Sequence, residues 1–217
     1  MAGPRDIDDV LTTTRAVRRR LDLARPVDPA LVRECVELAL QAPTGGNDQG
    51  WHFVVVTDPG LRASIAEVFR GAAVAYTQRE RPRRAPRRER SAEERTVRQK
   101  VLASSGYLFE HLQDVPVHVI PCVEGRPDES PLADQATLFG SILPAVWSFM
   151  LAARSRGLGT AWTTVHLEHE VEMAELLGIP GDSVTQVALI PVAHTVGDRF
   201  ERAWRRPVDD VVHWDRW

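Results

Sequence analysis

The sequence predicts one α+β domain, a sheet with helices packed on it, and three observations support this prediction. Helical and strand-like patterns alternate loosely along the 217 residues. The chain contains no internal repeat and no obvious domain boundary. Its apolar fraction of 43% and charged fraction of 26% are typical of a globular protein with a core of its own. We therefore treat residues 1–217 as a single domain.

The first half of the chain carries clear helix-start signals. Asp28 and Pro29 open a helix that ends before Pro43, and Asp58 and Pro59 open a second helix that continues to about Tyr76. Between them, residues 51–57 read as a buried strand. The inward faces of the two helices are expected to carry Leu31, Cys35, Leu38, Ala39, Leu61, Ile65, Val68 and Phe69.

Residues 79–100 differ in kind, with ten Arg or Lys against four Glu. One interpretation is a solvated, mobile loop that becomes a charged helix from Ser91 onward. The other is a basic arm for nucleic acid or for a phosphorylated cosubstrate. The segment lacks interleaved aromatic residues, which argues against nucleic acid.

The second half is predicted to contain three strands, at residues 115–122, Thr160–Val165 and Val184–Ala193. A long helix over Leu132–Arg156 ends at Gly157, and a short helix covers Glu168–Leu177. The tail from Pro207 ends in Trp214 and Trp217, which is unusual because chain ends are normally polar. We expect residues 207–217 to dock on another surface.

Composition also bears on location and partners. A net charge of −3 predicts no general affinity for nucleic acid or for anionic membranes, and no apolar run approaches the roughly 18 residues of a membrane span. The N-terminus shows no secretory signal, and Cys35 and Cys122 read as reduced packing residues. These features predict a cytoplasmic protein.

Two segments could bind a ligand. The loop Ala42–Trp51 contains paired glycines, which allow backbone N–H groups to approach a flat polar ligand. Arginines cluster at Arg15–Arg20 and again at Arg202–Arg206, and guanidinium groups suit phosphate. No metal site is expected, because only His166 and His169 are near neighbours; His166 is interpreted as a surface or capping residue.

Four motifs in order resemble the nitroreductase family of FMN-dependent oxidoreductases. They are Arg15-Ala-Val-Arg18, Ala42-Pro-Thr-Gly-Gly-Asn-Asp-Gln-Gly-Trp51, Gly157-Leu-Gly-Thr-Ala-Trp162 and Arg205-Arg-Pro-Val-Asp-Asp-Val-Val212. The resemblance implies a three-layer sandwich with a central, mostly antiparallel sheet flanked by helices. It also implies an intertwined homodimer with FMN at the subunit interface, in which the C-terminal arm embraces the partner.

The resemblance also implies roles for individual residues. Arg15, Ala16, Val17 and Arg18, with Arg205 and Arg206, would hold the phosphate and ribityl chain. Pro43, Thr44, Asn47 and Gln49 would approach the flavin from the partner subunit, and Thr160, Ala161 and Trp162 would line the isoalloxazine. The chain departs from the family pattern at Ala16 (usually Ser), Gly50 (usually Pro) and Ala203 (often Lys).

The implied activity is the reduction of nitroaromatics, quinones or similar electron-poor acceptors by NAD(P)H in a ping-pong mechanism. Flavin N5 carries that chemistry, so no catalytic side chain is required. The Arg-rich segment 79–100 could act as a lid that attracts the cosubstrate. Two alternatives remain open: an FMN-binding storage or sensor protein with little turnover, and a family member with other flavin chemistry such as dehalogenation or oxidation.

Overall fold

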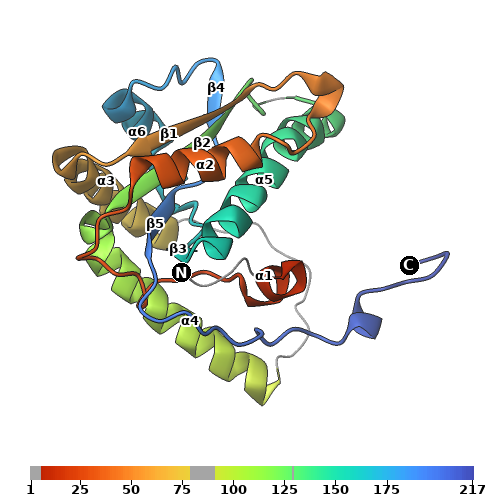
Figure 1. The fold of residues 1–217 in the computed structure, drawn as a ribbon. Helices are drawn as coiled ribbons and strands as arrows, with labels where there is room; N and C mark the ends of the chain where they lie inside the picture. The colour runs from red at the N-terminus through yellow and green to blue at the C-terminus, as the bar shows by residue number, and fades with distance from the viewer. Residues whose placement is uncertain (1–5, 79–90, 129) are drawn as a thin grey trace.

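The computed structural model describes residues 6–78, 91–128 and 130–217, and the expected lid falls largely outside them, at 79–90. Figure 1 shows a sheet covered by helices on both faces, which confirms the predicted three-layer α+β sandwich. The helices are α1 (Ile7–Thr13), α2 (Pro29–Ala39), α3 (Pro59–Gln78), α4 (Ala92–His111), α5 (Leu132–Ser155) and α6 (Glu170–Leu177). The strands are β1 (Trp51–Val56), β2 (Val117–Glu124), β3 (Leu158–Thr160), β4 (Val184–Gln186) and β5 (Ile190–His194).

The predicted helix starts are confirmed. Asp28 caps α2 by accepting a hydrogen bond from the Ala30 amide at 2.9 Å, and Asp58 accepts one from the Leu61 amide at 2.8 Å. Ser91 begins α4 with a capping box in which Ser91 and Glu94 satisfy each other's backbone amides. The helix predicted from Ser91 is therefore present.

The sheet is antiparallel throughout its strand pairs, in the order β1-β2-β5-β3, with β4 also paired to β2. Side chains of β2 alternate between two cores. Ile120 and Cys122 pack with α3 and α6, whereas Val119 and Val123 pack with α2 and α5. Burial on both faces explains why β2 is almost wholly apolar.

Two strand predictions and the predicted inward faces of two helices need correction. Residues 51–57 do not form a buried strand, because β1 lies at the sheet edge and only Val56 is buried. The strand predicted at Thr160–Val165 is wrong: β3 ends at Thr160, and beyond it only Thr163 still pairs, with Leu189, before the 3₁₀ turn Val165–His169 begins. The inward faces of α2 and α3 are also shifted, since Leu38 and Leu61 are exposed.

The single strand predicted at Val184–Ala193 is divided in two by a bulge. Val119 pairs with Ile190, and Cys122 pairs with Gln186. Two residues of β2 therefore face three residues, Val187–Leu189, on the opposite side, which is the extra residue that defines a β-bulge. On its other edge, Leu189 forms an isolated antiparallel bridge with Thr163, in the register of the β3–β5 pair.

α5 is long and apolar enough to span a membrane by length and composition alone. Its inner side is a core element, since Ile142, Val146 and Phe149 are buried against α2 and the sheet. Its outer side carries an exposed apolar stripe. The members of that stripe are Leu132, Ala133, Ala136, Gly140, Leu143, Pro144 and Trp147.

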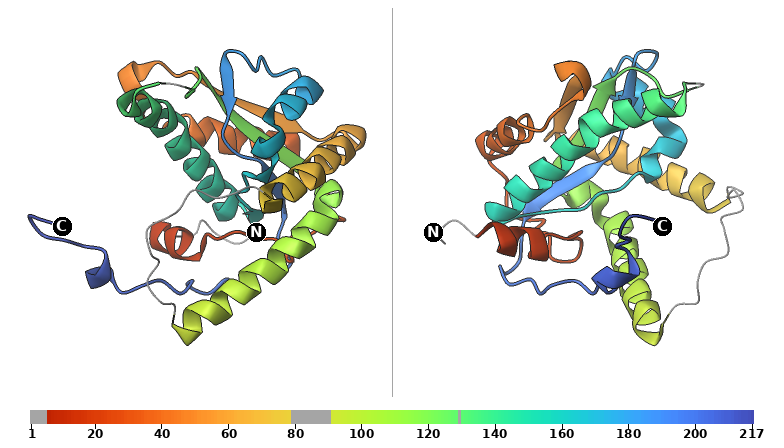
Figure 2. Two further views of the ribbon diagram at one scale, coloured as in Figure 1. Left: turned by 180° about the vertical axis from the view of Figure 1, so that it is seen from behind. Right: turned by 90° about the vertical axis from the view of Figure 1, so that its right-hand side faces the viewer.

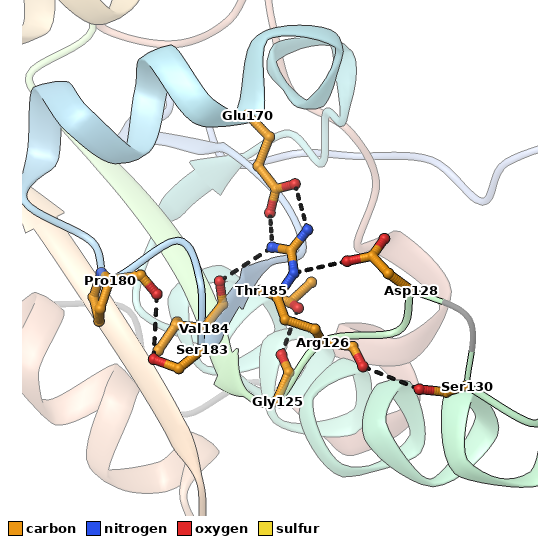
Figure 3. A network of polar contacts seen from close by, with 9 residues as sticks. All are labelled: Gly125, Arg126, Asp128, Ser130, Glu170, Pro180, Ser183, Val184 and Thr185. Carbon is orange, nitrogen blue, oxygen red and sulfur yellow. Dashed lines mark hydrogen bonds and ion pairs between the residues drawn. The ribbon is translucent and has the colours of Figure 1, made fainter.

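A polar network ties the loop after β2 to the start of α6 (Figure 3). Arg126 donates from Nη1 and Nη2 to both carboxylate oxygens of Glu170, at 2.7 and 3.1 Å, and from Nε to Asp128 at 3.0 Å. Hydrogen bonding to Glu170 is the main reason that the pKa of Arg126 is raised. Paired, partly buried contacts of this kind stabilise more than exposed ones.

We expect Arg126→Met to lower the free energy of unfolding by about 1–3 kcal/mol, because Glu170 loses a charged partner in a partly buried setting. Urea denaturation measures this change. Arg33→Met is the matched control: Arg33 pairs with Glu37 on the exposed surface of α2, and its loss should cost about 0.5 kcal/mol or less. Equal effects of the two variants would contradict the role given to Arg126.

Candidate functional site

The first and third motifs lie side by side at the edge of the sheet. Ala16 forms a parallel bridge with Thr160, and the Val17 amide donates to the Thr160 carbonyl at 2.8 Å. Gly159 makes this approach possible. A Cβ on Gly159 would lie 2.8 Å from Thr195 Cγ2 and 3.0 Å from Val17 Cβ, which is too close for any other residue without a shift of its neighbours. The structure thus brings Ala16, Val17 and Thr160 together.

Arg15 and Arg18 leave this edge in different directions. Arg15 donates from Nη2 to the Glu201 carbonyl at 2.6 Å, at the start of the C-terminal arm. Its Nε is buried and has no hydrogen-bond partner among the described residues. Arg18 donates to Ser104 Oγ of α4 at 3.2 Å, and partial burial lowers its pKa. Both guanidinium groups therefore keep unused capacity to bind an anionic or carbonyl oxygen.

A cavity of about 460 Å³ opens between α3, α4 and the segment after β3. Most of its wall is aromatic or aliphatic, and Arg18 is the single charged residue that lines it within the described part of the chain. Ala161 is buried beside it. The lining residues are Arg18, Phe69, Ala73, Val74, Thr77, Ser105, Gly106, Leu108, Phe109, Trp162, Thr163 and Val165. An apolar cavity with one cationic edge suits a flat ring system with polar atoms on one side.

The residues of α3 and α4 in this wall were not predicted as site residues. Phe69 was expected only to face inward, and Ser105, Gly106 and Phe109 carry no motif. Their position follows from the way that two helices, separated in sequence, pack beside Trp162. Such a wall is visible only once the fold is known.

The loop Ala42–Trp51 lies outside the lining of this cavity. Its Gly45 amide donates to Ser141 Oγ of α5 at 3.0 Å, and Thr44 Oγ1 accepts from the Gln49 amide at 3.2 Å. Pro43, Asn47 and Gln49 are exposed, and no residue of this loop lines the cavity at Arg18.

Backbone strain marks the same loop. Asn47 and Gln49 have positive φ angles of 59° and 54°, which side-chain-bearing residues adopt at a cost. Gly50 is held closely, since its carbonyl accepts from the Glu124 amide at 2.8 Å and a Cβ would lie 3.2 Å from Glu124 Cβ. The loop is thus a shaped, exposed surface, and Gly50 does not loosen it.

Arg205 and Arg206 are also separate from Arg15 and Arg18 within one chain. Both are exposed, and Arg205 donates to the carbonyl of its own neighbour Trp204. Figures 1 and 2 show the tail beyond them extending away from the body, with Trp214 and Trp217 exposed at its end.

Two other arginines hold the start of this arm. Arg20 and Arg154 each place a guanidinium over the ring of Phe200, at 4.0 and 4.3 Å from its centre. Arg20 also donates to the carbonyls of Val196 and Arg199. Arg20 therefore supports the arm and is not available as a phosphate ligand.

His166 is not a surface or capping residue, which corrects the prediction made for it. It is fully buried in the short 3₁₀ turn Val165–His169, one residue beyond the cavity wall at Val165. Neither ring nitrogen has a hydrogen-bond partner among the described residues, and burial lowers its pKa to about 4. In the described residues, no cluster of His, Cys, Asp or Glu is arranged to hold a metal ion.

Comparison with known proteins identifies the family of this chain. The family model described as the nitroreductase family matches residues 11–194. The chain belongs to the nitroreductase family. A nitroreductase-family protein of Methanothermobacter thermautotrophicus, provisionally named NADH dehydrogenase/NAD(P)H nitroreductase, is 24% identical over 217 residues, covering 98% of this chain and 88% of that protein. A 5,6-dimethylbenzimidazole synthase of Rhodospirillum rubrum is 29% identical over 144 residues, covering 64% and 61%.

Solved nitroreductase-like structures share the fold. An iodotyrosine deiodinase bound to FMN and 3-iodo-L-tyrosine has a TM-score of 0.71 at 19% identity, covering 98% of this chain and all of that one. An FMN- and NADPH-dependent nitroreductase from Sphigopyxis sp. strain HMH has a TM-score of 0.65 at 22% identity, with 98% and 100% covered. Proteins with this fold thus serve more than one chemistry.

The buried imidazole of His166 predicts acid sensitivity. Its pKa is about 6.5 when unfolded and about 4 in the fold, so the unfolded state binds the extra proton. Stability is therefore full above about pH 6.5 and falls as the pH drops toward 4, by up to about 1.4 kcal/mol per pH unit for one group. His118 contributes in the same sense, because burial also lowers its pKa to about 4.

We expect His166→Leu to remove a clear part of this pH dependence, since it removes one of three histidines, with His118 and His194, whose pKa burial lowers. The measurement is the free energy of unfolding in urea at pH 7, 6 and 5. Stability at pH 7 should be unchanged or higher, because two unpaired buried nitrogens are lost. An unchanged slope would show that His166 does not titrate on unfolding.

Proposed function

We propose that this protein is an FMN-dependent oxidoreductase that uses NAD(P)H to reduce quinones, nitroaromatics or similar electron-poor acceptors. The observation that carries the proposal is the apolar cavity at Trp162, whose charged edge is Arg18 and which adjoins the bridge between Ala16 and Thr160. Family membership, and relatives named as NAD(P)H nitroreductases, support it.

The residues present fit FMN. The orphaned Nε of Arg15 and the partly desolvated guanidinium of Arg18 suit the phosphate, the ribityl hydroxyls or the carbonyl edge of the ring. The apolar cavity suits the isoalloxazine. Ala16 offers no hydroxyl, so this end of the site depends on arginine and on backbone groups. Arg205 and Arg206 are proposed to complete the phosphate site in the assembled dimer.

The proposed homodimer explains three features that have no use in one chain. The α5 stripe is apolar but exposed, the arm carries two exposed tryptophans, and the strained loop at Asn47 and Gln49 lies apart from the cavity. A second copy could cover the stripe and Trp214 and Trp217. It could also bring Pro43, Thr44, Asn47 and Gln49 to the flavin edge. Cofactor binding would then require dimerisation.

Hydride acceptance and electron donation belong to the flavin when it is bound. The role of the chain is to bind the flavin and to orient it. Arg18 sets the polar edge of the cavity, and Phe69, Phe109 and Trp162 exclude water from the ring face. Among the described residues, no side chain that lines the cavity is an obvious acid or base, since Thr and Ser hydroxyls accompany Arg18. The proton that completes acceptor reduction therefore comes from solvent.

We propose a cytoplasmic location for the protein.

One experiment separates the proposal from its alternatives. The purified protein is scanned for flavin absorption, and NADH or NADPH is then added without oxygen. Loss of the flavin colour, followed by its return with a quinone or a nitroaromatic, supports the reductase. Bound flavin that neither nicotinamide reduces indicates a storage or sensor protein, or other flavin chemistry as in the deiodinase relative. A colourless protein that takes up no added FMN would overturn the reading.

We expect Arg15→Met and Arg18→Met each to raise the dissociation constant for FMN by roughly tenfold or more, because a charge-assisted hydrogen bond contributes about 1.5–3 kcal/mol. Fluorescence titration of the apoprotein measures it. Arg19→Met is the matched control, because Arg19 is exposed, lies outside the cavity lining and donates only a long hydrogen bond to the Ala103 carbonyl. An equal loss of FMN affinity in all three variants would indicate that the arginines act only through their overall positive charge, and not through specific contacts with FMN.

A further inference from the structure

Two glycines inside helices have no explanation within their own chain. Glycine weakens a helix interior relative to alanine, so it needs a reason. A Cβ on Gly106 of α4 or on Gly140 of α5 would meet nothing within 4 Å, and neither residue has a positive φ. Gly71 of α3 differs, because its Cβ would approach the His169 ring to 3.2 Å.

Gly140 lies on the exposed apolar stripe of α5, where a second copy is proposed to pack. A small residue there permits close approach of another surface. Gly106 has a different setting, since it lines the cavity at Trp162. The room that a side chain at Gly106 would occupy is therefore room next to the proposed flavin site.

At this point of α4, the open space at Gly106 lies close to the positive charge of Arg18. Ser104 holds the Arg18 guanidinium at 3.2 Å, and Ser105 and Gly106, the next residues along the helix, both line the cavity. The facing walls contain Phe69 of α3 and Trp162, and α4 itself adds Leu108 and Phe109. A ligand placed here meets aromatic surface and has a cation at one edge, and Gly106 is the one position on this part of α4 that presents no side chain to it.

We propose that Gly106 sets the size limit for the electron acceptor, and that the part of the cavity left open beside the bound flavin takes fused-ring quinones with an anionic or carbonyl edge in preference to single-ring ones. This inference rests on the proposed function. In the reaction, the quinone gains two electrons and two protons to become a hydroquinone. NAD(P)H loses a hydride to become NAD(P)⁺, and water supplies the second proton.

The test compares Gly106→Leu with Gln99→Leu in the FMN-loaded protein. Gln99 is an exposed residue two turns earlier on the same side of α4, outside the cavity lining, so it receives the same side chain without narrowing the cavity. We expect Gly106→Leu to lower kcat/KM for naphthoquinone and anthraquinone sulfonate by about tenfold or more, since small misfits in a pocket have effects of this size. Benzoquinone should be nearly unaffected, and Gln99→Leu should resemble the wild type.

A binding measurement makes the outcome independent of turnover. Calorimetric titration of oxidised protein with anthraquinone sulfonate should show weaker binding in Gly106→Leu, while flavin absorption stays at the wild-type level. Gly106→Ala should raise the melting temperature by a few degrees, which would show that the fold does not need this glycine. Equal losses for one-ring and fused-ring quinones, or unchanged anthraquinone binding, would overturn the inference. Failure of the proposed function itself would appear as wild-type protein that reduces no quinone at all.

Discussion

The candidate site depends on one short contact, the bridge between the N-terminal segment and β3. The Val17 amide donates to the Thr160 carbonyl at 2.8 Å, and Gly159 has no side chain to keep the two segments apart. This contact fixes where Arg15 and Arg18 leave the sheet. It also places Arg18 on the wall of the cavity that Trp162 lines, since Trp162 follows β3 by two residues. A displaced bridge would separate the cationic groups from the apolar cavity.

The sheet supports this edge from below. β2 is buried on both faces, and β5 joins it to β3. The bulge at Val187–Leu189 shifts the register along β2 by one residue, and on the opposite edge of the same chain segment Leu189 pairs with Thr163 in the unchanged register of β3 and β5. That bridge keeps the segment Ala161–Val165 next to β5, and the 3₁₀ turn Val165–His169 that follows packs against α3. The irregular part of the sheet is thus the part that borders the cavity.

Local signals predicted the helices well, because caps are encoded within a few residues. Asp28, Asp58 and Ser91 each cap a helix as their side-chain chemistry requires. The errors arose where tertiary context decides. β1 is apolar but lies at an edge, and nothing local in Val184–Ala193 reveals that two residues of β2 must face three. His166 shows the same limit, because its burial depends on packing that its neighbours in sequence do not reveal.

The motifs located part of the candidate site. Arg18 and Trp162 line the cavity, with Ala16, Val17 and Thr160 at its edge, whereas the Asn47 loop and Arg205 lie apart in a single chain. The roles given to those distant residues depend on a second subunit and stay predictions. The motifs did not predict the cavity walls formed by α3, with Phe69, and by α4, with Phe109. These walls arise from the packing of α3 beside α4.

The same bridge bears on how the chain folds. Val17 meets a partner more than 140 residues away, and Arg15 meets the Glu201 carbonyl still later in the chain. Contacts of such large sequence separation carry a high entropic cost and form slowly. During synthesis, the N-terminal arginines must wait until almost the whole chain has emerged. The edge that carries the candidate site is therefore expected to be among the last parts of the domain to order, and any ligand that binds there would stabilise it by mass action.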